Sequence, residues 1–401
     1  MRLLTKRKLS WFYGALFVLI ANTTQSLAQP DLAQKAAGLR ATVTSVHISS
    51  DGRYLVVRVI EQGLVDGFIM LDKEGSTLRL WDVATGKLQW EKKSPINYER
   101  PLLFSPDHKT LLSYGGQLVL EGGRTRRATN HFAALDVATG ENRFDLELVP
   151  GEQVGSLVFT PDGKSLVGNT FGNFPGPDGQ KRQQVAVKTW DSATGKLVRT
   201  IGAEWKAATS GDWALAGNLI ASRGLLRQND TMESTLFVWA LPDLSPVSSL
   251  VLGKDSTSRL AFSPDGKRVA FNSYSNDNLG LTNEVLNLWN IEENSSIAVA
   301  LPPDKNVGVR NFGFSPDGKT LIGSGISYEQ VPFEKTQFWF WDAQTGELKQ
   351  THTVAESSLE VGEYSPQAYL LPDGKSYLLF GQDKKPELRS LEDKALIRVF
   401  E

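Results

Sequence analysis

Apolar and polar residues alternate in short stretches along most of this chain, and turn-forming residues separate the stretches. In one clear example, alternating segments at 259–262 and 268–271 flank a Ser-Pro-Asp-Gly turn at 263–266. Proline presets φ, aspartate caps backbone N–H groups and glycine accepts a positive φ, so this pattern predicts two antiparallel strands joined by a tight turn. Branched and aromatic residues predict a third strand over 285–289 and a fourth over 297–301.

This four-stranded unit is repeated along the chain. The aspartate of its first turn recurs at Asp51, Asp107, Asp162, Asp265, Asp317 and Asp373. A second phrase, in most copies Trp-Asp before a turn, begins at Trp81, Leu135, Trp190, Trp239, Trp289, Trp341 and Leu391. The wide interval between Asp162 and Asp265 holds a degenerate copy, in which 213–220 replaces the first turn. Seven copies predict an all-β fold, a seven-bladed β-propeller of four-stranded antiparallel blades.

The paired phrases resemble those of WD-repeat β-propellers over nearly the whole chain after residue 28. Two features depart from that family. Its Gly-His pair is missing from every copy, so the family's buried Asp-His-Ser/Thr-Trp network cannot be assembled, and the repeat is longer than the family's about 40–45 residues. The segment 82–90 also resembles the Asp-x-x-Thr-Gly-Lys-x-x-Trp phrase of quinoprotein-type propellers, and 136–140 resembles it more weakly.

The first 28 residues have the pattern of a secretory signal peptide. A basic segment precedes the apolar run 9–21, and small residues at Ser26 and Ala28 occupy the positions that signal peptidase reads. The run is shorter than the about 20 apolar residues that a membrane-spanning helix needs. We expect cleavage after Ala28, with an uncleaved anchor as the alternative. The propeller then comprises 29–401, without a transmembrane segment, in an exported protein that is periplasmic or extracellular.

Composition narrows the chemistry. The 401 residues carry a formal net charge of −2, so no overall basic field favours nucleic acid as a partner. Cysteine is absent, which excludes disulfides, thiolate metal sites and cysteine nucleophiles. The four histidines fall in different repeats without the spacing of metal ligands, at His47, His108, His131 and His352. The sequence therefore predicts no metal site and no cofactor.

The extra length of the repeats lies between the second and third strands. It covers 61–75, 115–130, 169–183 and 324–335 in four of the copies. In the propellers that this chain resembles, these connections open on one face of the ring. Insertions gathered on one face usually mark the binding face of a repeat protein, so we expect enlarged loops there to contact a partner.

Charge and aromatic residues in these loops select the candidate binding residues. Cations from neighbouring blades suit an anionic ligand or an acidic protein patch, but Glu121 and Asp178 would balance them in a merely solvated loop. Exposed aromatic residues are enriched at interfaces, although such rings can also fold back onto the blades. The candidates are Arg124, Arg126, Arg127, Lys181, Arg182, Phe171, Tyr274 and Tyr328.

The sequence offers no catalytic residues. The aspartates of the repeated turns recur in six copies, which indicates backbone capping, and no Gly-x-Ser-x-Gly motif occurs. We therefore expect a binding or scaffold protein whose partner is another protein, with an anionic ligand as an alternative. Two other functions stay open: an extracytoplasmic, lactonase-like hydrolase, and a periplasmic factor for envelope assembly of the kind that quinoprotein-type propellers provide. An enzyme should show carboxylates or histidines converging at the channel mouth.

Overall fold

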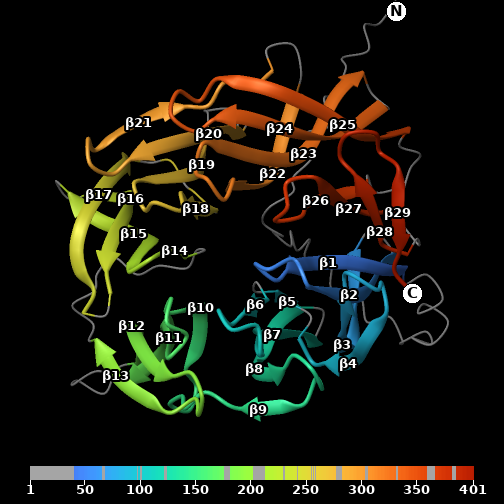
Figure 1. Ribbon diagram of the computed structural model, residues 1–401. Coiled ribbons are helices and arrows are strands. Elements are labelled where there is room, and N and C mark those ends of the chain that lie inside the picture. The colour runs from blue at the N-terminus through green and yellow to red at the C-terminus, as the bar shows by residue number, and fades with distance from the viewer. Residues whose placement is uncertain are drawn as a thin grey trace, which may run out of the picture.

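The chain forms a ring of seven antiparallel β-sheets around a central axis (Figure 1). The computed structural model describes residues 40–401 apart from residues 66–67, 97, 100–101, 122–123, 176–180, 202–212, 229–230, 242, 254, 256, 258, 277–281, 303–305, 331–332, 359–365 and 382–384. The predicted signal peptide and its cleavage site lie outside these residues. Within them there is no helix, and hence none able to span a membrane.

Each blade is built from consecutive strands. The first contains β1 (Arg40–Ile48), β2 (Tyr54–Val65), β3 (Phe68–Asp82) and β4 (Leu88–Ser94). The second contains β5 (Tyr98–Glu99), β6 (Leu103–Phe104), β7 (Thr110–Glu121), β8 (Arg124–Asp136) and β9 (Asn142–Phe144). The third contains β10 (Gln153–Phe159), β11 (Ser165–Pro175), β12 (Lys181–Asp191) and β13 (Leu197–Ile201). The fourth, the degenerate copy, contains β14 (Ala214–Ala216), β15 (Leu219–Gln228), β16 (Thr231–Ala240) and β17 (Ser245–Gly253).

The remaining three blades follow the same order. The fifth contains β18 (Leu260–Phe262), β19 (Arg268–Asn276), β20 (Thr282–Asn290) and β21 (Ser295–Ala298). The sixth contains β22 (Asn306–Phe314), β23 (Thr320–Gln330), β24 (Phe333–Asp342) and β25 (Leu348–Ser358). The seventh contains β26 (Gln367–Leu370), β27 (Ser376–Phe380), β28 (Glu387–Ser390) and β29 (Leu396–Val399). The predicted seven-bladed propeller is confirmed, with one variation: β5 and β6 share the innermost position of the second blade.

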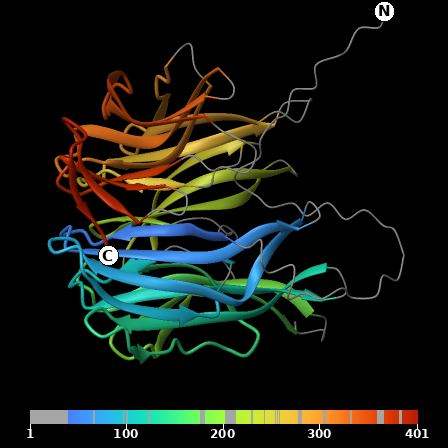
Figure 2. The ribbon, with the colours of Figure 1, turned by 90° about the vertical axis from the view of Figure 1, so that its right-hand side faces the viewer.

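The strands run between two faces of the ring, as Figure 2 shows. The turns after the first and third strands of each blade lie on one face, which we call the turn face. The hairpins that join the second and third strands lie on the opposite face, which we call the hairpin face.

The extra length on the hairpin face consists largely of strand, not loop as predicted. The β7–β8 ladder continues to the pair Glu121 and Arg124, and the β11–β12 ladder continues to Pro175 and Lys181. Continuing the ladder pairs backbone N–H and C=O groups that a long loop would leave to solvent, which is the physical reason for the difference. The candidate residues therefore sit on projecting hairpins.

The repeated turns use their aspartates as backbone caps, as predicted. In the fifth blade, Asp265 Oδ1 accepts hydrogen bonds from Ser263 Oγ (2.6 Å) and from the Lys267 N–H (3.0 Å). In the Trp-Asp turns the same role recurs, since Asp191 Oδ1 accepts from the Thr194 hydroxyl (2.7 Å) and the Thr194 N–H (2.8 Å). These carboxylates are engaged in holding turns.

Seven apolar clusters lie between the blades, one at each boundary. The third-strand tryptophans occupy four of them and are buried, at Trp81, Trp190, Trp289 and Trp341. Trp239 in the degenerate fourth blade is only partly buried, stacks on Phe237 and donates its indole N–H to Ser222 Oγ (3.1 Å). The buried apolar clusters of the fold therefore lie between neighbouring blades.

A pair of hydrogen bonds locks some of these boundaries. Trp190 Nε1–H donates to the Glu147 carbonyl (2.9 Å), and the Glu147 N–H donates to the carbonyl of Gly195 (2.9 Å). Glu147 follows the last strand of the second blade, whereas Trp190 and Gly195 belong to the third. We call this reciprocal pair the tryptophan lock.

Candidate functional site

Polar side chains form a layer around the axis, at one level of the inner two strands. On the innermost strands they stand four residues before the first residue of the Ser-Pro-Asp-Gly turn, at Ser45, Ser156, Arg259, Asn311 and Gln367. On the second strands they stand at the positions paired with these or equivalent to them, at Arg58, Tyr114, Asn169, Arg223, Asn272 and Ser324. We call this layer the polar level.

Two arginines among the second-strand members bind across blade boundaries. The Arg58 guanidinium is fully buried and donates to Ser113 Oγ in the second blade (2.7 Å). Arg223 in the fourth blade donates to the carbonyl of Thr257, which precedes the fifth (2.6 Å). Burial lowers the pKa of Arg223 from its usual high value. Such buried polar groups are tolerated because they are hydrogen-bonded.

Arg259 extends the positive charge across the axis. Its side chain is exposed and donates to the Asn311 side-chain oxygen in the sixth blade. Removal from bulk water, followed by the positive charges of Arg58 and Arg259, lowers the pKa of His47 from 6.5 to about 4. His47 and Arg58 belong to the first blade and Arg259 to the fifth, which are not neighbours in the ring. Arginines from two blades that are not neighbours therefore contribute to the lowered pKa of His47.

A carboxyl group lies beside this cationic region. Glu284 Oε1 accepts from the Tyr274 hydroxyl (3.2 Å) and from Asn272 Nδ2 (3.2 Å). Burial raises the pKa of Glu284, and these hydrogen bonds and the charge of Arg259 only partly oppose the rise. Tyr274, a predicted partner-binding residue, is thus half-buried on β19 and hydrogen-bonded to Glu284.

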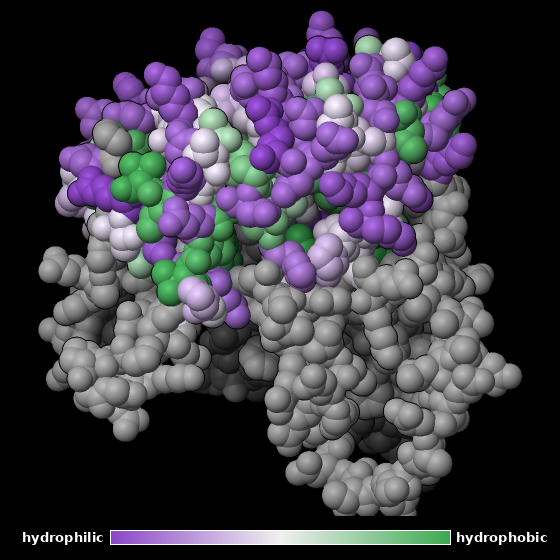
Figure 3. Space-filling view, turned by 90° about the horizontal axis from the view of Figure 1, so that it is seen from below, coloured by the Kyte–Doolittle hydropathy of each residue, from purple (hydrophilic) through white to green (hydrophobic). Residues whose placement is uncertain are grey.

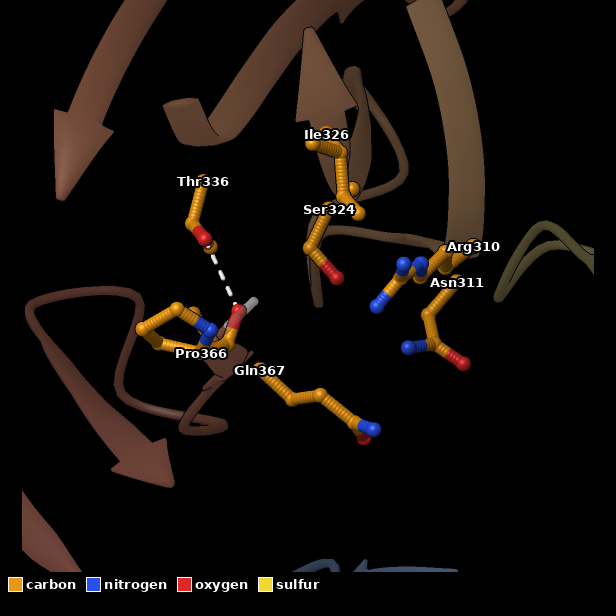
Figure 4. Close-up of a pocket in the computed structure, with 9 residues that line it drawn as sticks. Arg310, Asn311, Ser324, Ile326, Thr336, Pro366 and Gln367 are labelled. Atoms are coloured by element: carbon orange, nitrogen blue, oxygen red, sulfur yellow. Dashed lines mark hydrogen bonds between the residues drawn. The ribbon is translucent and has the colours of Figure 1, made fainter. Parts of the chain in front are cut away.

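A small hollow opens at the polar level between the sixth and seventh blades (Figure 4). Arg310 and Asn311 reach it from β22, and Gln367 reaches it from β26. The Thr336 hydroxyl donates to the Pro366 carbonyl (2.8 Å) and ties the two blades together behind the hollow. Guanidinium and amide groups thus face the same space.

This arrangement is suited to hold an anion. Arginine side chains reach the polar level from the first, fourth, fifth and sixth blades, and the carboxyl group of Glu284 lies near Arg259. Arginine matches carboxylate and phosphate geometry with paired N–H donors. Among the described residues there is no group of three or more histidine, aspartate or glutamate side chains that could hold a metal ion.

The predicted cations lie on the backbone of two neighbouring hairpins. Arg124, Arg126 and Arg127 stand on β8, opposite residues 118–121 of β7. Lys181 and Arg182 stand on β12, opposite Pro175 and Phe174 of β11. The side chains of these five residues lie outside the described part of the chain, so the structure relates them only through their strands.

The other two predicted aromatic residues also stand on hairpin strands. Phe171 is half-buried on β11, where it pairs with Gln153 and Val185. Tyr328 stands on β23 with its backbone paired to Asn306, and its side chain is not among those that the structure describes. The structure does not bring these two residues to the polar level.

The polar level itself is absent from the predicted site. Its signal was available, because aligning the copies on their first turn puts Ser45, Ser156, Arg259 and Asn311 in one column. Polar residues in a column that should face neighbouring blades are unusual for a propeller interior, since buried polar groups need partners. The loops stand out in the sequence because their lengths vary, whereas the residues of this column recur without any change in length.

The side of the ring shown in Figure 3 is mostly hydrophilic over the described residues, with limited apolar areas. Exposed apolar side chains on the outermost strands include Val198 of β13 and Val247 of β17, which are 67% and 50% exposed. Scattered apolar residues of this kind are normal on soluble surfaces. The polar level around the axis is therefore the candidate functional site.

Comparisons with known proteins show the fold and leave the family open. No protein-family model matches the chain, and no curated protein matches it. A solved structure of hydrazine synthase from Kuenenia stuttgartiensis is similar with a TM-score of 0.53 and 13% identity, covering 87% of this chain and 96% of that one. At this identity the likeness shows a shared propeller fold alone. The resemblance to WD repeats stays a prediction.

Proposed function

We propose that this protein is an exported, WD-repeat-like binding or scaffold protein whose polar level holds an anionic group of a partner protein. The observation that carries the proposal is the gathering of arginine donors at the polar level, where Arg58 donates to Ser113 and Arg259 donates to Asn311 across blade boundaries. An anion between them is attracted by both cations at once. Low-dielectric walls around such a site focus the field and strengthen the attraction.

The residue types favour binding over acid–base catalysis. Arginine stays protonated and presents several N–H donors in a fixed plane. Asn311 and Gln367 add neutral amide groups beside Arg310 in the hollow of Figure 4. None of these side chains has to gain or lose a proton in order to bind a carboxylate or a phosphate.

A protein partner fits the remaining features of the ring. The cations of β8 and β12 stand on neighbouring hairpins and offer a second contact for an acidic surface on the hairpin face. An acidic side chain of that partner would reach the polar level along the axis. The hairpin contact would set orientation and rate of approach, as long-range charge does at many interfaces.

The test uses a glutamate-rich synthetic peptide as the probe and its glutamine counterpart as the charge control. Arg259→Gln should weaken peptide binding about tenfold, or about 1.4 kcal/mol, measured by fluorescence anisotropy at low salt. Arg199→Gln removes the same charge from the exposed outer strand β13 and should leave the affinity unchanged. The difference should shrink at high salt, because ions screen the interaction.

Two outcomes would contradict the axial site. Equal affinities for Arg259→Gln and Arg199→Gln would mean that the polar level does not hold the probe. A loss seen only when Arg124, Arg126, Arg127, Lys181 and Arg182 are all replaced by glutamine would place the binding on the hairpins instead.

A further inference from the structure

The boundary between the first and second blades differs from the others on the turn face. At three other boundaries the glycine of one turn lies against the proline of the preceding blade's turn, as Gly163 does against Pro106, Gly318 against Pro264 and Gly52 against Pro372. At this boundary both partners are replaced. Ser50 takes the proline position of the first blade, and His108 takes the glycine position of the second.

His108 has a backbone conformation that favours glycine. Its φ is 56°, whereas the glycines at the same position of the other turns have φ between 64° and 72°, at Gly52, Gly163, Gly266, Gly318 and Gly374. A non-glycine residue in this left-handed region costs about 1 kcal/mol or more. Side-chain contacts must offset that cost, and residues held in such conformations cluster at functional sites.

The contacts of His108 join it to two adjacent residues of the first blade. Its Nδ1 lies 3.1 Å from Asp51 Oδ2, and its Nε2 lies 2.8 Å from Ser50 Oγ. The other carboxylate oxygen, Asp51 Oδ1, accepts from Ser49 Oγ (2.5 Å) and from the Arg53 N–H (3.0 Å). The carboxylate is thereby held in place against the imidazole.

The direction of these hydrogen bonds follows from chemistry. An ionised carboxylate only accepts, so Nδ1–H of His108 donates to Asp51 in the tautomer that leaves Nε2 without a proton. Nε2 then carries the free lone pair and accepts the hydroxyl proton of Ser50. Burial would raise the pKa of Asp51, but the bonds from Ser49 and Arg53 and the neighbouring His108 lower it below its usual value, so Asp51 is ionised at neutral pH. The order is carboxylate, imidazole, hydroxyl.

We propose that Asp51, His108 and Ser50 form a hydrolytic triad that cleaves small acyl esters on the turn face. Ser50 Oγ bonds to the ester carbonyl carbon while its proton passes to His108 Nε2. The bond from that carbon to the alcohol oxygen then breaks, and Nε2 returns the proton to the leaving alcohol. Water attacks the acyl group, its proton passes to Nε2 and then to Ser50 Oγ, and the acid leaves. Asp51 holds the imidazole and stabilises its positive charge.

Access and oxyanion stabilisation are compatible with this role. Ser50 and Asp51 are exposed and His108 is half-buried, so an ester can reach Ser50 Oγ from solvent. Proline at the equivalent position of other turns has no N–H, so the turn does not need the Ser50 N–H for its own hydrogen bonds. That N–H is a donor for the negative charge that develops on the carbonyl oxygen.

The experiment exposes the full-length protein to a fluorophosphonate probe and locates the label by peptide mass spectrometry. We expect label on Ser50 and none in Ser50→Ala. His108→Gly should slow labelling and p-nitrophenyl acetate hydrolysis at least a hundredfold. This change restores the Ser-Pro-Asp-Gly turn of the other blades, so the variant should fold. Asp51→Asn should slow both reactions while a hydrogen bond to Oδ1 is retained.

The outcomes distinguish a catalytic triad from a contact that only joins the two blades. Absence of label on Ser50, or labelling at the same rate in His108→Gly, would overturn the proposal. A lower melting temperature of His108→Gly with no hydrolysis by the wild type would mean that His108 only joins the two blades. Binding of the glutamate-rich peptide should be the same in Ser50→Ala and wild type, so this proposal and the axial binding site fail independently.

Discussion

The boundary where the ring closes can be compared with the boundaries inside the chain. Between the fifth and sixth blades, Trp341 Nε1–H donates to the Ala300 carbonyl (2.8 Å) and the Ala300 N–H donates to the Gly346 carbonyl (2.9 Å). Between the seventh and first blades, Trp81 Nε1–H donates to the Glu401 carbonyl (2.8 Å) and the Glu401 N–H donates to the Gly86 carbonyl (3.2 Å). The closing boundary thus uses the same tryptophan lock.

Two further sets of side-chain contacts cross the closing boundary. Arg398 donates to the carbonyls of Val83 (2.6 Å) and Ala84, and Phe400 packs edge-on against Trp81 with ring centroids 6.2 Å apart. At internal boundaries the peptide chain itself connects the two blades, whereas here nothing covalent does. Among the described strands, β29 pairs with β28 of its own blade, so closure depends on side chains and on the lock. Internal boundaries use the same kinds of contact, since Trp90 Nε1–H donates to the Val137 carbonyl and Phe338 packs edge-on against Tyr377. The comparison teaches that the closing boundary is held by these contacts without a covalent link.

The largest expected effect comes from removing the closing aromatic. Phe400 is fully buried, so Phe400→Ala should lower the free energy of unfolding by about 3–5 kcal/mol, as for other large-to-small aromatic changes. Trp289→Ala at an internal boundary should cost a similar amount. Urea denaturation followed by circular dichroism measures both. Ile397→Ala, 49% exposed on β29 just before Phe400, should cost less than about 0.5 kcal/mol. A loss below about 1 kcal/mol for Phe400→Ala would mean that closure contributes little.

A fall in pH should lower the free energy of unfolding through His47, which stands on the innermost strand of the first blade. The pKa of His47 is lowered to about 4 in the folded protein from 6.5, so the unfolded chain binds the proton first as pH falls. Above pH 6.5 the imidazole of His47 is neutral in the folded and the unfolded chain, so it adds no pH dependence to the free energy of unfolding. Between pH 6.5 and 4 the protein should lose up to about 3 kcal/mol of stability through His47. His47→Gln should abolish that share of the loss, measured by urea denaturation at pH 7 and pH 4. Equal losses in wild type and variant would show that His47 titrates normally.

The smallest expected loss of stability comes from removing the indole donor of each tryptophan lock, which compares the closing lock with the internal ones. Trp81→Phe, Trp190→Phe and Trp341→Phe each remove the indole donor and leave a carbonyl without it, which should cost about 1–2 kcal/mol. The three values should agree within about 0.5 kcal/mol if the closing lock equals the internal ones. A much smaller cost for Trp81→Phe would indicate that the closing lock is open in solution.

Much of the fold could be predicted from local patterns. The Ser-Pro-Asp-Gly and Trp-Asp phrases mark turns and strands within one blade, and the structure has these turns and strands where the phrases place them. The hairpins were predicted as loops because polar residues there obscure the alternation of a strand. Their ladders form because the neighbouring strand offers backbone partners, which periodicity alone does not reveal.

The candidate sites could not be predicted in the same way. Arg259 and His47 are far apart in the chain, and their meeting depends on the curvature that brings the fifth blade opposite the first. Ser50 and His108 read separately as two imperfect copies of one turn. Only the packing of adjacent blades shows that the two departures face each other.

The sequence by itself determined the number of blades, the four strands in each and the turns, because each depends on contacts among residues close in the chain. The tertiary structure decided which unusual residues meet: Trp81 with Glu401, Arg259 with His47, and His108 with Ser50. These contacts cross from one blade to another. Their physical basis is the closed ring, which brings side chains from separate repeats within hydrogen-bonding or electrostatic reach.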